Sequence, residues 1–277
     1  MQIWITALAI VLLLPATGCS QGWHAKQGWK AEDYFTDQQV IALCKAIEAK
    51  DVAEIDRLVQ AEVDVNTTGK FNMTPLLWAF PDDNLDCFRR LLEHGANPNV
   101  IVEGFQIPPR GAFWKGDSVM HMSLRTARPE YFDLVFQHGG DPSLMGAISN
   151  MTEAPIHTLV MSGGLDRQAK IARLLELGAD IHQKNGAGNE AVTIAVGWFG
   201  QYKLALWLLE QGADPRAQRL DQKTRLIHKV LVERKRARTA PEQVQKDYAA
   251  LVAYLEKQGE SLEQAERDMK EWGYKYE

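Results

Sequence analysis

The sequence predicts an all-α, elongated fold in which about six helix pairs stack side by side. One observation is a recurring stop after an apolar helical stripe, which occurs as Gly95-Ala96-Asn97, Gly139-Gly140-Asp141, Gly178-Ala179-Asp180 and Gly212-Ala213-Asp214. The glycines of these stops lie 44, 39 and 34 residues apart, a spacing typical of repeat proteins. A further observation is a short helix-start motif that precedes the helix pairs. The 277 residues, 45% of them hydrophobic, are enough for such an array.

Each stop has a physical reason. Glycine adopts the left-handed conformation that ends a helix without a Cβ clash. Proline follows three of the stops, at Pro98, Pro142 and Pro215, and cannot continue a helix. Asp or Asn suits the turn that comes next. Less regular copies at 62–66 and 259–261 extend the pattern toward both ends of the chain.

The helix-start motif occurs as Thr74-Pro75-Leu76-Leu77, Ser118-Val119-Met120-His121, Ala154-Pro155-Ile156-His157, Glu190-Ala191-Val192-Thr193 and Arg225-Leu226-Ile227-His228. Together, the start and stop motifs resemble the ankyrin repeat, whose signature is T-P-L-H-x-A followed by L-L-x-x-G-A-D. The resemblance covers the chain from about Asp37 onward. It implies an ankyrin-repeat solenoid with β-hairpin or loop fingers. It also implies that His121, His157 and His228 hydrogen-bond neighbouring backbone, whereas Leu77 and Thr193 depart from the pattern.

The first 14 residues carry no charge and are nearly all apolar, but a membrane span needs about 20 residues. They run into Leu14-Pro15-Ala16-Thr17-Gly18-Cys19, which resembles a bacterial lipoprotein signal. The resemblance implies cleavage after residue 18 and lipidation of Cys19. Serine at position 20 resembles outer-membrane sorting, so we expect a periplasmic protein anchored to the outer membrane. An uncleaved anchor or a plain secretory signal is the alternative.

The expected domain organisation is a signal peptide at 1–18, a tether at 19–36 and a repeat domain at 37–277, with approximate repeats at 37–66, 67–99, 113–143, 149–182, 185–216 and 221–277. The tether tryptophans, Trp23 and Trp29, either lie at the lipid interface or dock on the first repeat. The step from Thr74 to Ser118 is 44 residues instead of about 33. An apolar inserted finger is therefore expected at 100–117.

The helices of the array are expected to begin and end at identifiable residues. Asp37 suits an N-cap for the first helix, and Asp51 begins its partner. The interhelix turns are expected at Pro81-Asp82, Arg128-Pro129, 162–166 and 197–200. A charged segment, 233–246, stretches the sixth repeat, and a polar-faced helix at 261–272 caps the array.

Composition and motifs limit the function. A net charge of −5 does not suggest a nucleic-acid partner. No H-E-x-x-H, G-x-S-x-G, P-loop or C-x-x-C pattern occurs, so we expect no enzyme activity, no cofactor, no metal site and no small-molecule substrate. Cys44 and Cys87 lie on apolar helix faces, which favours two buried thiols over a disulfide. The basic run 225–238 favours a solvated face over a contact with an acidic partner or anionic lipid.

A protein partner is the expected ligand, because ankyrin arrays bind proteins with their finger tips and the inner face of the first helices. By motif position, the candidate residues are Phe71, Asn72, Phe105, Phe113, Trp114, Lys115, Met122, Arg125, Asn185, Trp198, Phe199 and Arg219. Aromatic and arginine side chains are enriched in interface hot spots, although some of these aromatics instead fill gaps between repeats.

The architecture resembles small ankyrin-repeat lipoproteins that serve as immunity proteins for antibacterial effectors, including lipases delivered to the periplasm. This resemblance implies a toxic protein partner encoded by an adjacent gene. The alternative is an envelope scaffold or protective ankyrin protein, for example in oxidative-stress defence, which holds a partner without inhibiting it.

Overall fold

The computed structural model describes residues 22–104, 113, 115–148, 151–162, 166–218 and 223–274, apart from the side chains at 147, 148, 151, 198 and 199. The α-helices are α1 (Trp23–Gln27), α2 (Gln38–Ala49), α3 (Val52–Gln60), α4 (Pro75–Ala79), α5 (Leu85–Glu93), α6 (Val119–Arg125), α7 (Pro129–Gln137), α8 (Pro155–Ser162), α9 (Arg167–Glu176), α10 (Ala191–Phe199), α11 (Tyr202–Glu210), α12 (Leu226–Arg238), α13 (Glu242–Lys257) and α14 (Leu262–Glu271). Short 3-10 turns are η1 (Ala31–Asp33), η2 (Lys70–Asn72) and η3 (Phe80–Asp82).

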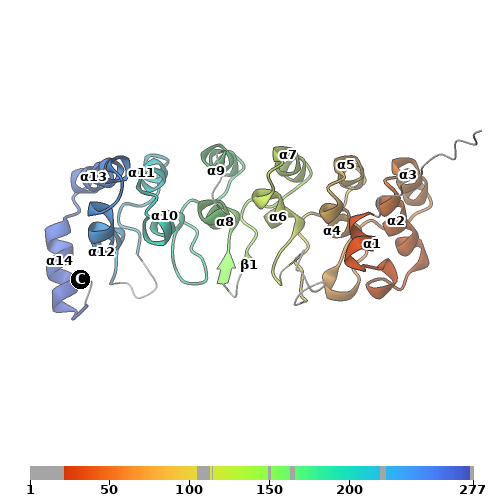
Figure 1. The fold of residues 1–277 in the computed structure, drawn as a ribbon, viewed down its shortest axis with the longest axis horizontal. Helices are drawn as coiled ribbons and strands as arrows, with labels where there is room; N and C mark the ends of the chain where they lie inside the picture. Colours follow the sequence, from red (N-terminus) through yellow and green to blue (C-terminus); the bar gives the residue numbers. More distant parts are fainter. Residues whose placement is uncertain are drawn as a thin grey trace, which may run out of the picture.

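The helices form an elongated stack, not a closed globule (Figure 1). Within the described residues, six antiparallel pairs run from α2/α3 through α12/α13, and α14 packs beside α12 at the C-terminal end. One row contains the first helix of each pair and the other row contains the second (Figure 1). The prediction of an all-α repeat solenoid is therefore confirmed.

Fingers extend from the first row of helices, on the side away from the second row (Figure 1). Strands β1 (Gly146–Ile148) and β2 (Met151–Glu153) form an antiparallel hairpin in one finger, in which Gly146 pairs with Glu153. In the inserted finger, the N–H of Val102 donates to the Asp117 carbonyl and the N–H of Gly116 donates to the Val102 carbonyl, both at 2.8 Å. These bonds close the base of the finger.

The sequence determines where the helices begin and end. The Asp37 carboxylate caps α2 by accepting from the N–H of Gln39 at 2.8 Å, as predicted. The Thr74 hydroxyl caps α4 by accepting from Leu77 N–H at 3.1 Å. At the other ends, the stop glycines all have positive φ, with Gly95 at 82° and Gly212 at 102°.

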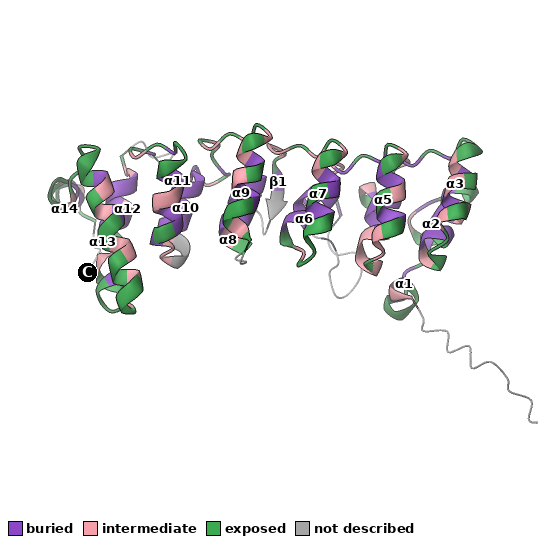
Figure 2. Cartoon of the chain, turned by 90° about the horizontal axis from the view of Figure 1, so that it is seen from above, coloured by how far each residue is buried: buried purple, intermediate pink, exposed green. Residues whose placement is uncertain are grey.

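Burial differs between the two rows of helices (Figure 2). Every described side chain of α6 except Arg125 is buried, whereas α9 and α13 bury only one face. A first-row helix packs against its partner and against the neighbouring repeats, so it has little surface left for solvent. The buried side chains form one continuous core along the array.

Asparagine side chains connect the stops of consecutive repeats. Asn66 Nδ2 donates to the Gly95 carbonyl at 3.0 Å, and Asn99 Nδ2 donates to the Gly139 carbonyl at 2.8 Å. In both cases the asparagine Oδ1 also accepts the backbone N–H two residues beyond the glycine, at 2.7 and 2.9 Å. Each asparagine therefore holds the spacing between two repeats at the ends of their second helices.

The segment before the first repeat is folded onto the array, which corrects the expectation of a tether for residues 22–36. Trp29 is 4% exposed and packs on Trp78 at a ring-centroid distance of 5.3 Å. The N–H of Trp23 donates to Asp82 Oδ1 at 3.1 Å. Of the two interpretations of the tryptophans, the structure shows docking for Trp29, but onto Trp78 of the second repeat and Phe113 of the inserted finger instead of onto the first repeat.

The described residues contain two free thiols, Cys44 and Cys87, and both are buried. Burial raises the pKa of the Cys87 thiol to about 11 and that of Cys44 in the same direction. The expectation of two small buried side chains is confirmed. Within the described part of the chain, no helix has the length and apolarity required to cross a bilayer.

Candidate partner-binding surface

The first finger begins at Phe71 and Asn72, two predicted partner contacts with positive φ values of 63° and 58°. The Phe71 carbonyl accepts the N–H of Glu103 at 3.1 Å, and Asn72 Nδ2 donates to the Ile101 carbonyl at 3.2 Å. The first finger thus holds the base of the inserted finger. The Phe71 ring is 37% exposed, with Lys70 Nζ at 4.9 Å from its centroid. The ring is therefore exposed on a backbone that these two hydrogen bonds hold in place.

Phe113 lies elsewhere than predicted. Its side chain is 0% exposed and packs on Trp29 at 5.7 Å, so it belongs to the core between the inserted finger and the N-terminal segment. As a partner contact, this prediction is wrong for the structure described here, because a buried ring offers no surface. Phe105 and Trp114 lie outside the described residues, whereas Lys115 is exposed.

On the inner face of α6, only one of the two predicted contacts reaches the surface. Met122 is 8% exposed and packs inside the array, which corrects its assignment as a contact. The Arg125 side chain is 29% exposed, and its Nη2 donates to Oδ1 of the fully buried Asp117. Because a buried carboxylate holds the guanidinium, Arg125 is presented in a fixed orientation at the end of α6.

Asn185 is 7% exposed, so it too is a structural residue instead of a surface contact. Its Nδ2 donates to Glu153 Oε1 at 3.0 Å, and its Oδ1 accepts the N–H groups of Ala187 and Asn189. The N–H of Gly186 donates to the Thr152 carbonyl at 2.8 Å. These bonds join two neighbouring fingers. The prediction failed because Asn185 resembles a finger-tip residue in sequence, and only the tertiary contact with Glu153 buries it.

Glu153 is a buried acid inside this junction. Its side chain is 1% exposed, and its Oε2 has no hydrogen-bond partner among the described residues. Burial raises the pKa of Glu153 to about 7, which the hydrogen bond from Asn185 partly opposes. The junction between the two fingers therefore contains a carboxyl group that titrates near neutral pH.

Three predicted contacts cannot be placed at the surface. Trp198 and Phe199 end α10, but their side chains lie outside the described ones, as does all of Arg219. A finger residue that the sequence analysis missed is Met145, which precedes β1 and is 36% exposed. The signal available in the sequence was its position between the third repeat (113–143) and the fourth (149–182), where a finger is expected.

The motif histidines are structural. His157 Nδ1 accepts the N–H of Ala154 at 3.0 Å, and its Nε2–H donates to the Gln183 carbonyl of the next finger at 2.9 Å. His121 Nε2 donates to the Leu144 carbonyl at 3.1 Å. Burial lowers the pKa of His121 and of His157 to about 4, so both rings are neutral. This role was predicted.

His228 makes the same Nδ1 contact as His157, but its Nε2 has a different kind of partner. Its Nδ1 accepts the N–H of Arg225 at 3.0 Å, as His157 does with Ala154. Its Nε2 meets the Asp268 carboxylate of α14 at 3.2 Å instead of a backbone carbonyl. A side chain of α14 thus takes the place that a carbonyl of the next finger has for His157.

The Ser118–His121 pair, which resembles a nucleophile and base, is also structural. The Ser118 hydroxyl donates to His121 Nδ1 at 2.9 Å and accepts the His121 N–H at 3.2 Å. Both side chains are 0% exposed. The hydroxyl has no access to a substrate and caps α6 instead. Among the described residues, no group of three or more His, Cys, Asp or Glu side chains could hold a metal ion.

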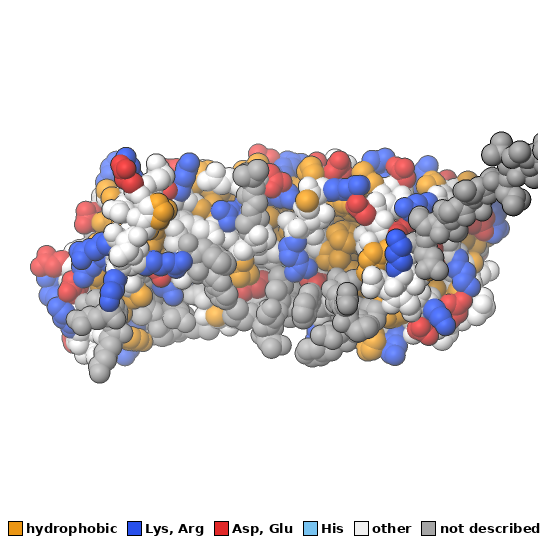
Figure 3. All heavy atoms as spheres, viewed as in Figure 1, with side chains coloured by type: hydrophobic (Ala, Val, Ile, Leu, Met, Phe, Trp, Pro, Cys, Tyr) orange, Lys and Arg blue, Asp and Glu red, His pale blue; other side chains and the backbone are white. Residues whose placement is uncertain are grey.

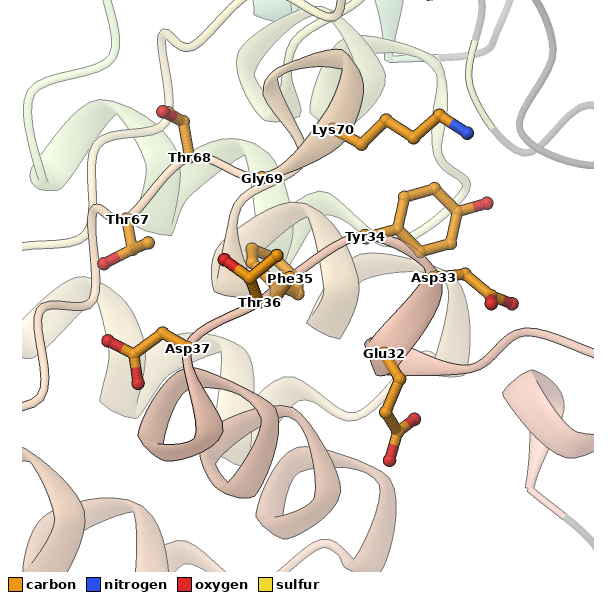
Figure 4. A pocket seen from close by; sticks show the side chains of 10 residues that line it. All are labelled: Glu32, Asp33, Tyr34, Phe35, Thr36, Asp37, Thr67, Thr68, Gly69 and Lys70. Atoms are coloured by element: carbon orange, nitrogen blue, oxygen red, sulfur yellow. The ribbon is translucent and has the colours of Figure 1, made fainter.

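A hollow of about 400 Å³ lies between the N-terminal segment and the first finger. Its lining is Glu32, Asp33, Tyr34, Phe35, Thr36, Asp37, Thr67, Thr68, Gly69 and Lys70. Figure 4 shows that these side chains point in different directions instead of toward a common centre, and that Lys70 and Tyr34 extend away from the others. The N–H of Lys70 donates to the Tyr34 carbonyl at 2.8 Å, so the two walls are joined by backbone. The hollow is therefore the boundary between two packed segments, and its side chains do not converge on a ligand position.

The face seen in Figure 3 carries a group of hydrophobic side chains between α6 and α1, and separate Lys and Arg side chains along the rest of the array. Of the predicted contacts, the structure brings Phe71, Asn72, Lys115 and Arg125 to the N-terminal half of the stack. It places Phe113, Met122 and Asn185 inside the molecule.

Comparisons with known proteins agree with this geometry. The ankyrin repeat family matches residues 71–101. The ankyrin repeat domain of Bcl-3, described as a unique member of the IkappaB protein family, superposes with a TM-score of 0.56 at 19% identity, covering 79% of this chain and 86% of that one. An ankyrin repeat domain from Acinetobacter baumannii AYE has a TM-score of 0.56 at 17% identity, covering 76% and 96%. No curated protein sequence gives a significant match.

Ankyrin repeats form protein–protein interaction modules, and the motif match lies in the repeat that contains Phe71 and Asn72. The stacked pairs, the glycine stops and the fingers extend the same plan over the rest of the described chain. The protein therefore has the fold of an ankyrin-repeat solenoid.

Proposed function

We propose that this protein is a lipid-anchored periplasmic binding protein that neutralises a toxic protein partner through its fingers and the neighbouring inner face. The observation that carries the proposal is the exposure of Phe71 and Met145, two large apolar side chains on different fingers, at 37% and 36%. Phe, Met and Arg are enriched in protein–protein interfaces relative to the rest of a protein's surface. Arg125, held by Asp117, lies on the repeat between those fingers.

The anchor part of the proposal is supported by the sequence leading to Cys19, which resembles a lipoprotein signal. The neutralising part is supported by the resemblance of this architecture to ankyrin-repeat immunity lipoproteins. An array of this kind inhibits by covering the active-site mouth of its partner, and tight binding with slow dissociation is expected.

The test uses the full chain and the product of an adjacent gene. Co-expression is expected to relieve the toxicity of that product in the periplasm, and the two proteins should purify together. Binding without relief of toxicity would favour the alternative, an envelope scaffold. Absence of any toxic neighbour and of any partner binding would contradict the proposal.

Matched variants locate the contact. Phe71→Ala and Met145→Ala are each expected to weaken partner binding by about 10-fold or more, because truncation of a hot-spot residue costs about 2 kcal/mol or more. Val232→Ala serves as the control, since Val232 is 40% exposed but lies within α12, in the last helix pair, and belongs to no finger. Equal losses for all three variants would show that fingers are not the contact.

A further inference from the structure

The N-terminal end of the array carries an exposed face to which no role has been given. It consists of Trp23, Lys26 and Lys30, on α1 and just after it, and is called the anchor face below. Lys26 and Lys30 are exposed, whereas Trp23 is half-buried because its ring packs edge-on against Trp29 at 4.9 Å, so only part of the indole is available to the headgroups. Neither lysine forms an ion pair with any residue that the structure describes, whereas nearby Lys45 pairs with Glu32 at 2.6 Å.

The backbone under the anchor face is fixed. The N–H of Trp23 donates to Asp82 Oδ1 at 3.1 Å, and the Asp82 side chain is only 6% exposed. His24 is 1% exposed and bonds to the Trp78 carbonyl at 2.8 Å. Helix α1 is thus docked on the first two repeats and does not act as a loose spacer (Figure 1).

The chain between the anchor and this docked helix is short. Trp23 follows Cys19 by four residues. A fully extended chain spans at most about 3.3–3.6 Å per residue, so α1 begins within roughly 14 Å of residue 19. The polar headgroup layer on each side of a bilayer is roughly 5–8 Å thick. A helix attached by so short a link has to lie at the membrane surface.

We propose that the anchor face lies on the headgroups of the phospholipid bilayer, so that the array is held against the membrane in one orientation. This inference rests on the lipidation of Cys19 in the proposed function. Tryptophan suits the headgroup region because its ring is apolar and its N–H is polar. Lys26 and Lys30, which form no ion pair with a described residue, match the negative charge of anionic headgroups.

The orientation restricts where a partner can bind. In Figure 2, α1 lies beside the ends of the first two helix pairs, on the side opposite the turns that follow the second-row helices. The membrane therefore lies beside α1 at one end of the array, and the repeats from α6 onward lie farther from the anchor. The partner reaches Met145 more freely than it reaches the first repeat.

The test places the full-length, lipidated protein in vesicles of phosphatidylethanolamine and phosphatidylglycerol that contain a headgroup-labelled quencher lipid. A fluorophore is attached at Gln27→Cys, which keeps both lysines, or at Glu263→Cys as the matched distant site, whose side chain is 83% exposed. The native thiols, Cys44 and Cys87, are buried. Quenching at position 27 is expected to exceed that at position 263 at least threefold.

A second variant separates the short link from the headgroup contact. Insertion of 15 Gly/Ser residues between 21 and 22 gives a link whose root-mean-square length is about 21 Å, so quenching at position 27 should fall toward the value at 263. Charge reversal, Lys26→Glu with Lys30→Glu, is expected to lower quenching at 27 in the protein without the insertion.

Equal quenching at both sites in protein that floats with the vesicles would overturn the orientation and leave the anchor intact. Protein that does not float would show that the anchor itself, and with it the proposed function, is wrong.

Discussion

The imidazole of His24 stacks on the indole of Trp78, with ring centroids 4.6 Å apart and an angle of 18° between the planes. The His24 Nε2–H also donates to the Trp78 carbonyl at 2.8 Å. Trp78 Nε1–H in turn donates to Glu48 Oε1 at 3.1 Å. These contacts connect the N-terminal segment, the first repeat and the second repeat, so residues 22–36 act as a cap for the array.

The cap should contribute to stability. Trp29→Ala removes a ring that is 4% exposed and touches Trp78 and Phe113. We expect it to lower the free energy of unfolding by about 3–5 kcal/mol, because it leaves a cavity. Chemical denaturation of the purified protein measures the loss, and Lys30→Ala, an exposed neighbour, should change stability by less than about 0.5 kcal/mol. An unchanged midpoint for Trp29→Ala would mean that the segment is only a tether.

A pair of glycines tests the seam between the cap and the first finger. A Cβ on Gly69 would lie 2.4 Å from the Tyr34 carbonyl oxygen and 2.8 Å from the Phe35 ring, whereas a Cβ on Gly22 would have its nearest neighbour at 3.9 Å. Gly69→Ala should therefore push the cap and the finger apart and lower the melting temperature, because the Tyr34 backbone cannot move away without disturbing the packing around it. Gly22→Ala should leave the melting temperature nearly unchanged. If both variants melt alike, the seam has no structural role.

The buried carboxyl of Glu153 predicts a pH dependence. Because burial raises its pKa in the folded protein to about 7 from 4.5, the unfolded chain loses the proton first as pH rises. Stability from this group is thus full below about pH 4.5 and is lost between 4.5 and 7. Glu153→Gln, which keeps an oxygen for the Asn185 amide, should be more stable than the parent by about 1–3 kcal/mol at pH 8 and equal to it near pH 4.

Thermal melts of Glu153→Gln and the parent across this range check the prediction. Glu93→Gln, at the exposed end of α5, is the control and should not alter the slope. A parent that is no less stable than Glu153→Gln at pH 8 would contradict it.

The buried histidines predict the opposite slope. Burial lowers the pKa of His157 to about 4 from 6.5, so below pH 6.5 the unfolded chain takes up the proton first. Its stabilising contribution is present above 6.5 and is lost as pH falls from 6.5 to 4. His157→Gln should be less stable than the parent at pH 7.5, since it disturbs the bonds to Ala154 and Gln183, yet this difference should shrink toward pH 4. A constant difference across the range would refute the neutral-histidine assignment.

The repeat plan could be predicted from the sequence because it depends on local chemistry. A glycine with positive φ ends a helix wherever it occurs, and Thr74 or Ser118 caps the helix that follows it by bonding a backbone N–H three residues on. Such interactions involve neighbours in the chain, so a single sequence records them. The motif histidines belong to the same class, because Ala154 and His157 are three residues apart.

The tertiary structure alone decided which side chains are available to a partner. Phe113 is buried because Trp29, 84 positions earlier in the chain, covers it, and Asn185 is buried because Glu153 of the preceding finger accepts its amide. Burial of this kind depends on contacts between segments that are distant in sequence, for which residue type and motif position carry no record. For the same reason, residues 22–36 resemble a spacer in sequence but fold onto the array as its cap.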